Sequence, residues 1–392
     1  MNSSLFSIAI PTKNRHFLLT DTIRSVLDQS YSHIEVVICD NSDNDATYNV
    51  FSSFRDSRLR YHKTGGLTMH ENWEAAFNKT MGEFVTILED KQLLRYEAVE
   101  RILKYFINKD VDIVTWHVNA FNDLSKIKRV SSSKTKYKTG IYSCDEVIRI
   151  ALSSGSNLWK HYLPIAHHTA VRRELSNKVI SLSNTQFDPI CPDYTSAFKW
   201  LNYGNKIACL SDALSVFATL RQSNGRNVML KNKDGDNFFK ESKKSQDDTF
   251  NNIPIKARNI AGLIYNDFLS IQKCGVGNLS HHKINLVILY SDFYNSMINQ
   301  KNMGVDISGE LFEWKKALSN ETQKIQNEVF SLINNFSLRN RFVLLKNIFK
   351  KIKSYMRKYI LRKKEYNFIT PIDYILHEKQ KYQALSKIKN YK

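Results

Sequence analysis

Hydrophobic positions in the first 115 residues alternate between short apolar runs and stretches with helical spacing. The apolar runs predict buried strands, and apolar side chains that recur every three or four residues predict amphipathic helices. The expected strands are Leu5–Ile10, Ile34–Cys39, Phe84–Leu88 and Asp112–Trp116, with a weaker one at Arg58–His62. Such alternation predicts an α/β fold, in which a mostly parallel sheet carries helices on both faces.

Beyond residue 116 the pattern is less regular. A strand is expected at Ala213–Leu220, and apolar positions at helical spacing recur over residues 255–335. Polar composition predicts an exposed loop at Ser125–Lys138 and a mobile loop or linker at Gln222–Asp248. We expect three parts, namely the two halves of one α/β domain (residues 1–116 and 117–253) and a helical C-terminal region (residues 254–392).

The net charge of +19 is concentrated in the C-terminal region, where 24 Lys/Arg and 10 Asp/Glu follow Ile253. Residues 339–364 hold 11 Lys/Arg and no acidic residue, with aliphatic and aromatic positions at helical spacing. A basic amphipathic helix of this kind is typical of an anionic membrane surface. Packing of its apolar face on the α/β domain is the main alternative, and nucleic acid is not the expected partner.

Candidate chemistry lies where three of the expected strands end. Ligands of open α/β sheets bind at the carboxyl ends of the strands. This rule selects Pro11–Arg15, Asp40–Asp43 and Glu89–Gln92. Backbone amides and a carboxylate at the first two ends suit a base and ribose, and the third could face a diphosphate.

These segments, in their order along the chain, resemble a known family. The strings SIAIPTKNR, LLTDTIRSVLDQSY and IEVVICDNSD, followed by Asn72–Ala76 and Gly82–Phe84, are similar to the start of a family 2 glycosyltransferase of the GT-A fold, of the bacterial polysaccharide-building type. The resemblance covers roughly residues 5–225. It implies inverting transfer of a sugar from a nucleotide-diphosphate donor, most naturally a UDP-sugar, to a hydroxyl of a cell-surface glycan or a lipid-linked acceptor.

The resemblance also implies roles for the strand ends. Residues 1–116 would bind the nucleotide-sugar, and residues 117–253 would bind the acceptor and carry the catalytic group. The residues expected to contact the donor nucleotide are Pro11, Thr12, Asn14, Arg15, Asp40 and Asn41. For Asp40, a helix cap or turn role after the strand is the alternative.

The third strand end departs from the family pattern. Family members place Asp-x-Asp or Asp-Asp-Asp there to hold Mg²⁺ or Mn²⁺, which take oxygen ligands. This chain reads Glu89-Asp90-Lys91, and an ammonium group cannot coordinate a cation. Asp90 could bind a metal with Glu89 or water, Lys91 could itself stabilise the leaving diphosphate, or Asp90 could cap a helix while Lys91 faces solvent. The sequence leaves metal dependence open.

An inverting transfer needs a general base near the acceptor hydroxyl. In the family this carboxylate often follows a proline, and here Asp193 follows Pro192 at the start of a helical pattern. Asp193 is therefore the expected base, with a helix cap as the alternative reading and Asp188 as the rival carboxylate. Arg221 and Arg226 follow the strand expected at Ala213–Leu220 and are candidate diphosphate contacts on a lid.

Other features narrow the setting. The first residues carry no basic stretch followed by an apolar run, and no window of the chain is apolar enough to span a membrane. The five cysteines are scattered and form no CxxC pair, which is typical of a reducing compartment. We expect a cytoplasmic protein attached peripherally to the inner face of the membrane. A non-catalytic nucleotide- or carbohydrate-binding protein is the alternative, favoured by Lys91.

Overall fold

The computed structural model describes residues 4–124, 129–131, 138–154, 163–242, 249–334 and 370–390. Ten strands form one sheet in the described chain. They are β1 (Phe6–Thr12), β2 (Ile34–Asp40), β3 (Leu59–Lys63), β4 (Phe84–Ile87), β5 (Gln92–Leu94), β6 (Ile113–Asn122), β7 (Arg129–Ser131), β8 (Gly140–Ser143), β9 (Thr169–Arg172) and β10 (Lys206–Phe217).

The strand order is β3-β2-β1-β4-β9-β6-β10-β5, with β7 beside β6 and β8 beside β10. The four strands from β3 to β4 are parallel, and β10 is parallel to β6. The remaining pairs, including those of β9 with β4 and β6, are antiparallel. The predicted α/β class is confirmed, and the sheet is continuous across the expected boundary at residue 116 because β6 spans it.

The two faces of the sheet are covered by different helices because successive side chains of a buried strand point to opposite sides. Phe6, Ile8 and Ile10 of β1 pack with α1 (His16–Leu27) and α4 (Ala98–Lys109). Ala9 points the other way and joins a larger core that contains α3 (Met69–Asn78). Both faces of β1 are therefore buried.

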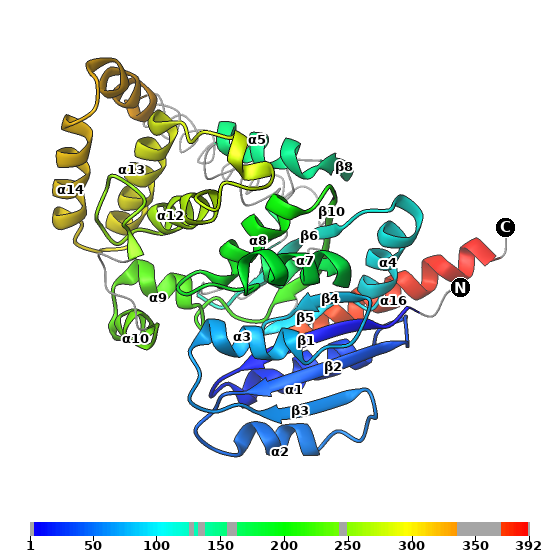
Figure 1. The fold of residues 1–392 in the computed structure, drawn as a ribbon. Helices are drawn as coiled ribbons and strands as arrows, with labels where there is room; N and C mark the ends of the chain where they lie inside the picture. Colours follow the sequence, from blue (N-terminus) through cyan, green and yellow to red (C-terminus); the bar gives the residue numbers. More distant parts are fainter. Residues whose placement is uncertain are drawn as a thin grey trace, which may run out of the picture.

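The larger core extends into the C-terminal helices (Figure 1). The remaining helices are α2 (Ala46–Ser52), α5 (Cys144–Ser154), the 3-10 turn η1 (Ala166–His168), α7 (Arg173–Ser183), α8 (Pro192–Tyr203), α9 (Asn224–Leu230), α10 (Lys233–Glu241), α12 (Ile260–Gln272), η2 (Asn278–His281), α13 (Leu286–Asn302), α14 (Ser308–Ser319) and α16 (Pro371–Asn390).

The prediction of a loop or linker at Gln222–Asp248 is wrong for most of this segment, because α9 and α10 lie within it. The polar residues that favoured a loop are the helix caps. The side chain of Ser223 accepts from the backbone N–H of Arg226, and that of Asn232 accepts from the N–H of Gly235. Within the loop expected at Ser125–Lys138, residues 129–131 instead form β7, which pairs with β6.

The chain returns to the N-terminal half through α16, which lies along the edge strand β5 (Figure 1). Tyr374 and Ile375 pack on Leu93 and Val216, and Lys379 forms an ion pair with Asp28. The basic helix expected at residues 339–364 lies outside the described residues. No helix in the described ranges has the length and apolarity needed to cross a membrane.

Candidate active site

The carboxyl ends of β1, β2 and β4 open onto a cleft of about 610 Å³. The opposite wall is formed by the start of α8, by α9 and α10, and by Ile260 and Leu263 of α12. Residues expected in the site that line this cleft are Pro11, Thr12, Arg15, Asn41, Glu89, Asp90, Lys91, Asp193 and Arg226. The structure therefore brings three separate parts of the sequence to one opening.

Asp90 lies at the centre of the sheet-side wall and is almost fully buried. One carboxylate oxygen accepts from the hydroxyl of Thr12 at 2.8 Å, and the other accepts from the guanidinium of Arg15 at 3.2 Å. Arg15, which was expected to contact the donor nucleotide, also donates from its second terminal nitrogen to the side chain of Asn224 of α9 at 3.1 Å. Burial raises the pKa of Asp90, and the charge of Arg15 opposes that shift.

Lys91 is also buried in this wall, with 8% of its side chain exposed. Its Nζ lies 3.1 Å from Oε2 of Glu89 and donates to the backbone carbonyl of Gln222 at 2.8 Å. Burial raises the pKa of Glu89, but Lys91 and His167 lower it more, so that the net shift is downward. The carboxylate form of Glu89 is therefore favoured beside Lys91.

These residues do not fit a divalent cation without losing both ion pairs. A hard cation would have to displace the guanidinium of Arg15 from Asp90 and the ammonium group of Lys91 from Glu89. In the described chain, no three His, Cys, Asp or Glu side chains are grouped as metal ligands. The cations that face the strand end are instead side chains of the protein.

Asp193 lies in the first turn of α8, directly after Pro192. Its own backbone N–H and that of Tyr194 favour the carboxylate, as expected at a helix N-terminus. Burial raises the pKa of Asp193; the charge of His167 opposes the shift and that of Glu89 adds to it. The rival Asp188 does not line the cleft, because its carboxylate is bound by Lys199 and Thr185, both at 2.8 Å.

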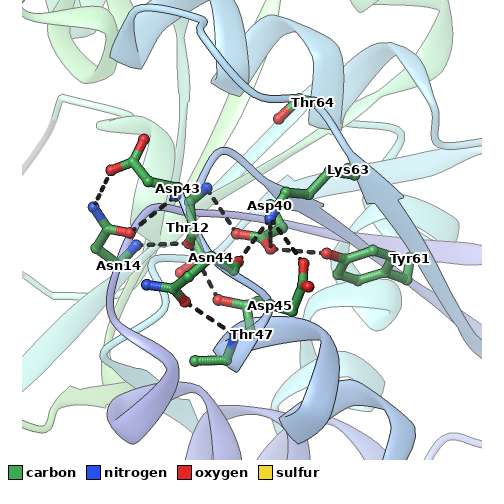
Figure 2. Close-up of polar contacts among 12 residues, drawn as sticks. Thr12, Asn14, Asp40, Asp43, Asn44, Asp45, Thr47, Tyr61, Lys63 and Thr64 are labelled. Carbon is green, nitrogen blue, oxygen red and sulfur yellow. Dashed lines mark hydrogen bonds and ion pairs between the residues drawn. The ribbon is translucent and has the colours of Figure 1, made fainter.

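Asp40 is fully buried below the cleft and does not line it. As Figure 2 shows, its carboxylate accepts from the hydroxyl of Tyr61 at 2.8 Å and from Lys63 at 3.3 Å. The other oxygen accepts from the backbone N–H of Ser42 at 2.9 Å. These bonds lower the pKa of Asp40 against the effect of burial. The arrangement is that of a turn-forming residue, and Asn41 is the residue of this strand end that faces the cleft.

Two other expected contacts lie away from the cleft. Asn14 is exposed and its amide donates to Asp43 at 2.9 Å (Figure 2). Arg221 is exposed and donates to the backbone carbonyl of Asp123 at 3.2 Å. Arg226, in the first turn of α9, is the arginine of this region that lines the cleft. The sequence could not separate the two arginines without knowing that a helix begins between them.

Some residues that line the cleft were not among the site residues predicted from the sequence. His167 of η1 lies 3.5 Å from Glu89, between the acidic strand end and Asp193. Lys13 and Glu241 pair across the opening at 3.1 Å and join the first strand end to α10. Met69, Asn72 and Trp73 of α3 also line the cleft, and the only signal for them was the position of the Asn72–Ala76 motif.

Parallel strand ends that converge on cationic side chains, with a carboxylate on a helix that lines the same cleft, agree with the GT-A fold. The comparisons with known proteins agree. The family model described as "Glycosyl transferase family 2" matches residues 7–178. This match spans somewhat less than half of the chain, and it shows that the N-terminal part is similar to glycosyltransferase family 2.

Among curated proteins, glycosyltransferase GlyG of Streptococcus pneumoniae is 22% identical over 227 residues, which are 55% of this chain and 71% of that protein. The Escherichia coli protein WfgD, named as a UDP-Glc:α-D-GlcNAc-diphosphoundecaprenol β-1,3-glucosyltransferase, is 25% identical over 37% of this chain and 58% of its own. The solved structure of S. aureus TarS residues 1–349 with UDP-GlcNAc superposes with a TM-score of 0.51. It covers 84% of this chain and 83% of its own at 16% identity, which supports the fold.

Proposed function

We propose that this chain transfers a hexosyl or N-acetylhexosaminyl group from a UDP-sugar to a hydroxyl of a cell-surface glycan or lipid-linked acceptor, with inversion at the anomeric carbon. The observation that carries the proposal is the position of Asp193. Its carboxylate comes from the start of α8 and lines the same cleft as Arg15 and Lys91, which follow β1 and β4, and as Arg226 of α9. A carboxylate that can act as base and cations that can receive the charge of a leaving diphosphate, in one cleft, suit a displacement at the anomeric carbon.

In the proposed step, the carboxylate of Asp193 takes the proton of the acceptor hydroxyl. The resulting oxygen forms a bond to the anomeric carbon, while the bond from that carbon to the diphosphate oxygen breaks. Both electrons of that bond leave with the nucleoside diphosphate. Arg15, Lys91 and Arg226 would stabilise the charge that develops on the departing diphosphate.

The donor and acceptor classes rest on relatives and neighbours. The neighbouring structure was solved with UDP-GlcNAc, and the names of WfgD and of a Campylobacter jejuni relative describe acceptors or products linked to undecaprenol through a diphosphate. We extend both to this chain as part of the proposal. Because Lys91 and Arg15 already pair with the carboxylates of the acidic strand end, we further propose that transfer needs no divalent cation.

The test is UDP release from a panel of UDP-sugars with undecaprenyl-diphosphate-linked acceptors, for the unaltered protein and for Asp193→Asn. The variant should lose at least about 10²-fold in kcat, since general-base catalysis contributes about 10²–10⁴-fold. Binding of UDP should be unchanged. Asp145→Asn is the matched control, because Asp145 pairs with His282 away from the cleft.

Full transfer by Asp193→Asn would remove Asp193 as the base. UDP binding by the unaltered protein with no transfer across the panel would instead favour the non-catalytic binding protein.

A further inference from the structure

Helix α3 contacts both sides of the cleft. Near its start, the amide of Asn72 donates to the backbone carbonyls of Cys39 at 3.2 Å and Thr12 at 3.4 Å, where β2 and β1 end. On its other side, the rings of Trp73 and Phe77 meet the buried ring of Phe187 edge-on, with centroids 5.7 and 5.5 Å apart. Phe187 belongs to the segment between α7 and α8, so one helix touches both the donor strands and the approach to Asp193.

Glu74 of α3 makes the polar contacts to this segment. A single carboxylate oxygen accepts from the backbone N–H of Gln186 at 2.8 Å and of Phe187 at 3.0 Å. The other oxygen accepts from the amide of Asn78 at 3.2 Å. Hydrogen bonds to a charged acceptor are stronger than neutral ones. Two successive amides bound to one oxygen fix the direction of the backbone at that point.

The same segment is held from α8. Lys199 donates to the backbone carbonyl of Thr185 at 2.9 Å and to the carboxylate of Asp188 at 2.8 Å. Beyond these anchors, Ile190 has a φ of 81°, in the left-handed region that a β-branched residue rarely adopts. Such a conformation persists only where the surrounding structure imposes it. Ile190 lines the cleft and lies three residues before Asp193.

We propose that Glu74 is a positioning residue for sugar transfer. By binding the backbone of Gln186 and Phe187 it holds residues 185–191, and thereby the strained turn at Ile190, so that Asp193 keeps its place against the donor. The inference rests on the proposed function, in which Asp193 is the general base. It gives the Asn72–Ala76 motif a role, as the connection between the donor strands and the base.

Glu74→Ala should lower kcat by about 10- to 100-fold, because a shift of about 1 Å in a reacting group can cost about 10²-fold in rate. KM for the UDP-sugar should stay within about twofold, as for a loss confined to the chemical step. Glu74→Gln should restore kcat, since its amide oxygen can accept both backbone bonds and the exposed Asn78 can turn its own amide to match.

Glu35→Ala is the matched control. One carboxylate oxygen of Glu35 accepts from the backbone N–H groups of Met81 and Gly82. This is the same kind of contact as that of Glu74, but it lies at the N-terminal end of β2, whereas the cleft is at the carboxyl end. This variant should lower Tm as Glu74→Ala does, yet keep kcat when assayed below both transitions. If Glu74→Ala does not fold, the shorter Glu74→Asp should lower kcat by about tenfold for the same reason.

Unchanged kcat in both Glu74→Ala and Glu74→Asp would overturn the inference, as would equal losses of kcat in the Glu74→Ala and Glu35→Ala variants. The outcome is distinct from failure of the proposed function. If Asp193→Asn is inactive while the Glu74 variants are fully active, only the positioning role fails. If Asp193→Asn is fully active, the proposed function fails and the positioning role falls with it.

Discussion

Replacing Lys91 with methionine removes the cation that sits nearest the acidic strand end while keeping the length of the side chain. The Nζ lies 3.1 Å from Glu89 and 2.8 Å from the carbonyl of Gln222, in a site that is largely closed to water. The Nζ also lies 5.7 Å from the centroid of the Phe217 ring, against which a methionine thioether can pack. The substitution therefore tests the charge more than the packing.

The size of the effect follows from Coulomb's law. Two unit charges about 4 Å apart attract by about 4 kcal/mol at an effective dielectric constant of about 20. If the leaving diphosphate has gained roughly half of its new charge in the transition state, Lys91 contributes about 2 kcal/mol, or about 30-fold in rate. Loss of Lys91 also leaves Glu89 uncompensated beside the diphosphate, so a loss of up to about 10³-fold is expected.

The assay is UDP release under saturating donor, with and without EDTA and with added Mn²⁺. We expect Lys91→Met to lose between about 30- and 10³-fold in kcat in every condition, and Lys91→Arg to keep a larger share because the charge remains. Lys104→Met is the control, since Lys104 pairs with Glu100 on the exposed face of α4. Wild-type kcat in Lys91→Met would refute the reasoning, and so would unaltered protein that is inactive in EDTA and recovers with Mn²⁺.

Two further predictions concern pH and the C-terminal helix. Because the pKa of Asp193 is raised, kcat/KM should fall with decreasing pH at a pH above the ordinary aspartate pKa of about 3.9. Glu89→Gln should move this acid limb of the pH profile to lower pH, and His167→Asn should move it to higher pH. An acid limb that neither variant moves would contradict the assignment of Asp193. Ile375→Ala should lower the free energy of unfolding in urea by about 2 kcal/mol, because Ile375 is 4% exposed and packs against Leu93. Leu376→Ala should lower it by less than about 0.5 kcal/mol, because Leu376 is 47% exposed. Equal losses in the two variants would mean that α16 does not pack on β5 in solution.

Local patterns in the sequence predicted the elements that position the donor side of the cleft. Leu5–Ile10 and Ile34–Cys39 are apolar because both faces of β1 and β2 are buried, so the strands stand out without any tertiary information. Thr12 and Asp90 meet because parallel neighbours end at one edge. Asp193 was singled out through the family resemblance, in which the base often follows a proline, and the expected helix start at Pro192 is confirmed.

Other features could not be predicted because they depend on contacts between distant residues. The docking of α16 brings Lys379 to Asp28, and nothing local in either segment indicates the other. Glu74 looks like an ordinary polar position of an amphipathic helix, and only the fold shows that it binds Gln186 and Phe187. Ser223 and Asn232 are equally common in loops and at helix N-caps, so the sequence could not separate the two.

Lys91 stands where the family pattern has a carboxylate, and its positive charge compensates negative charge at a strand end that is largely buried. Glu89 is partly buried and stands beside the buried Asp90, and the charge of Glu89 adds to the effect of burial in raising the pKa of Asp90. A third carboxylate at position 91 would add to that repulsion until a divalent cation arrived. Lys91 and Arg15 supply the compensating charge permanently, since each pairs with one of the two carboxylates. The same two ion pairs place two cations at the strand end where the diphosphate is proposed to bind. For this reason the charge of Lys91, and not only its packing, should govern the rate.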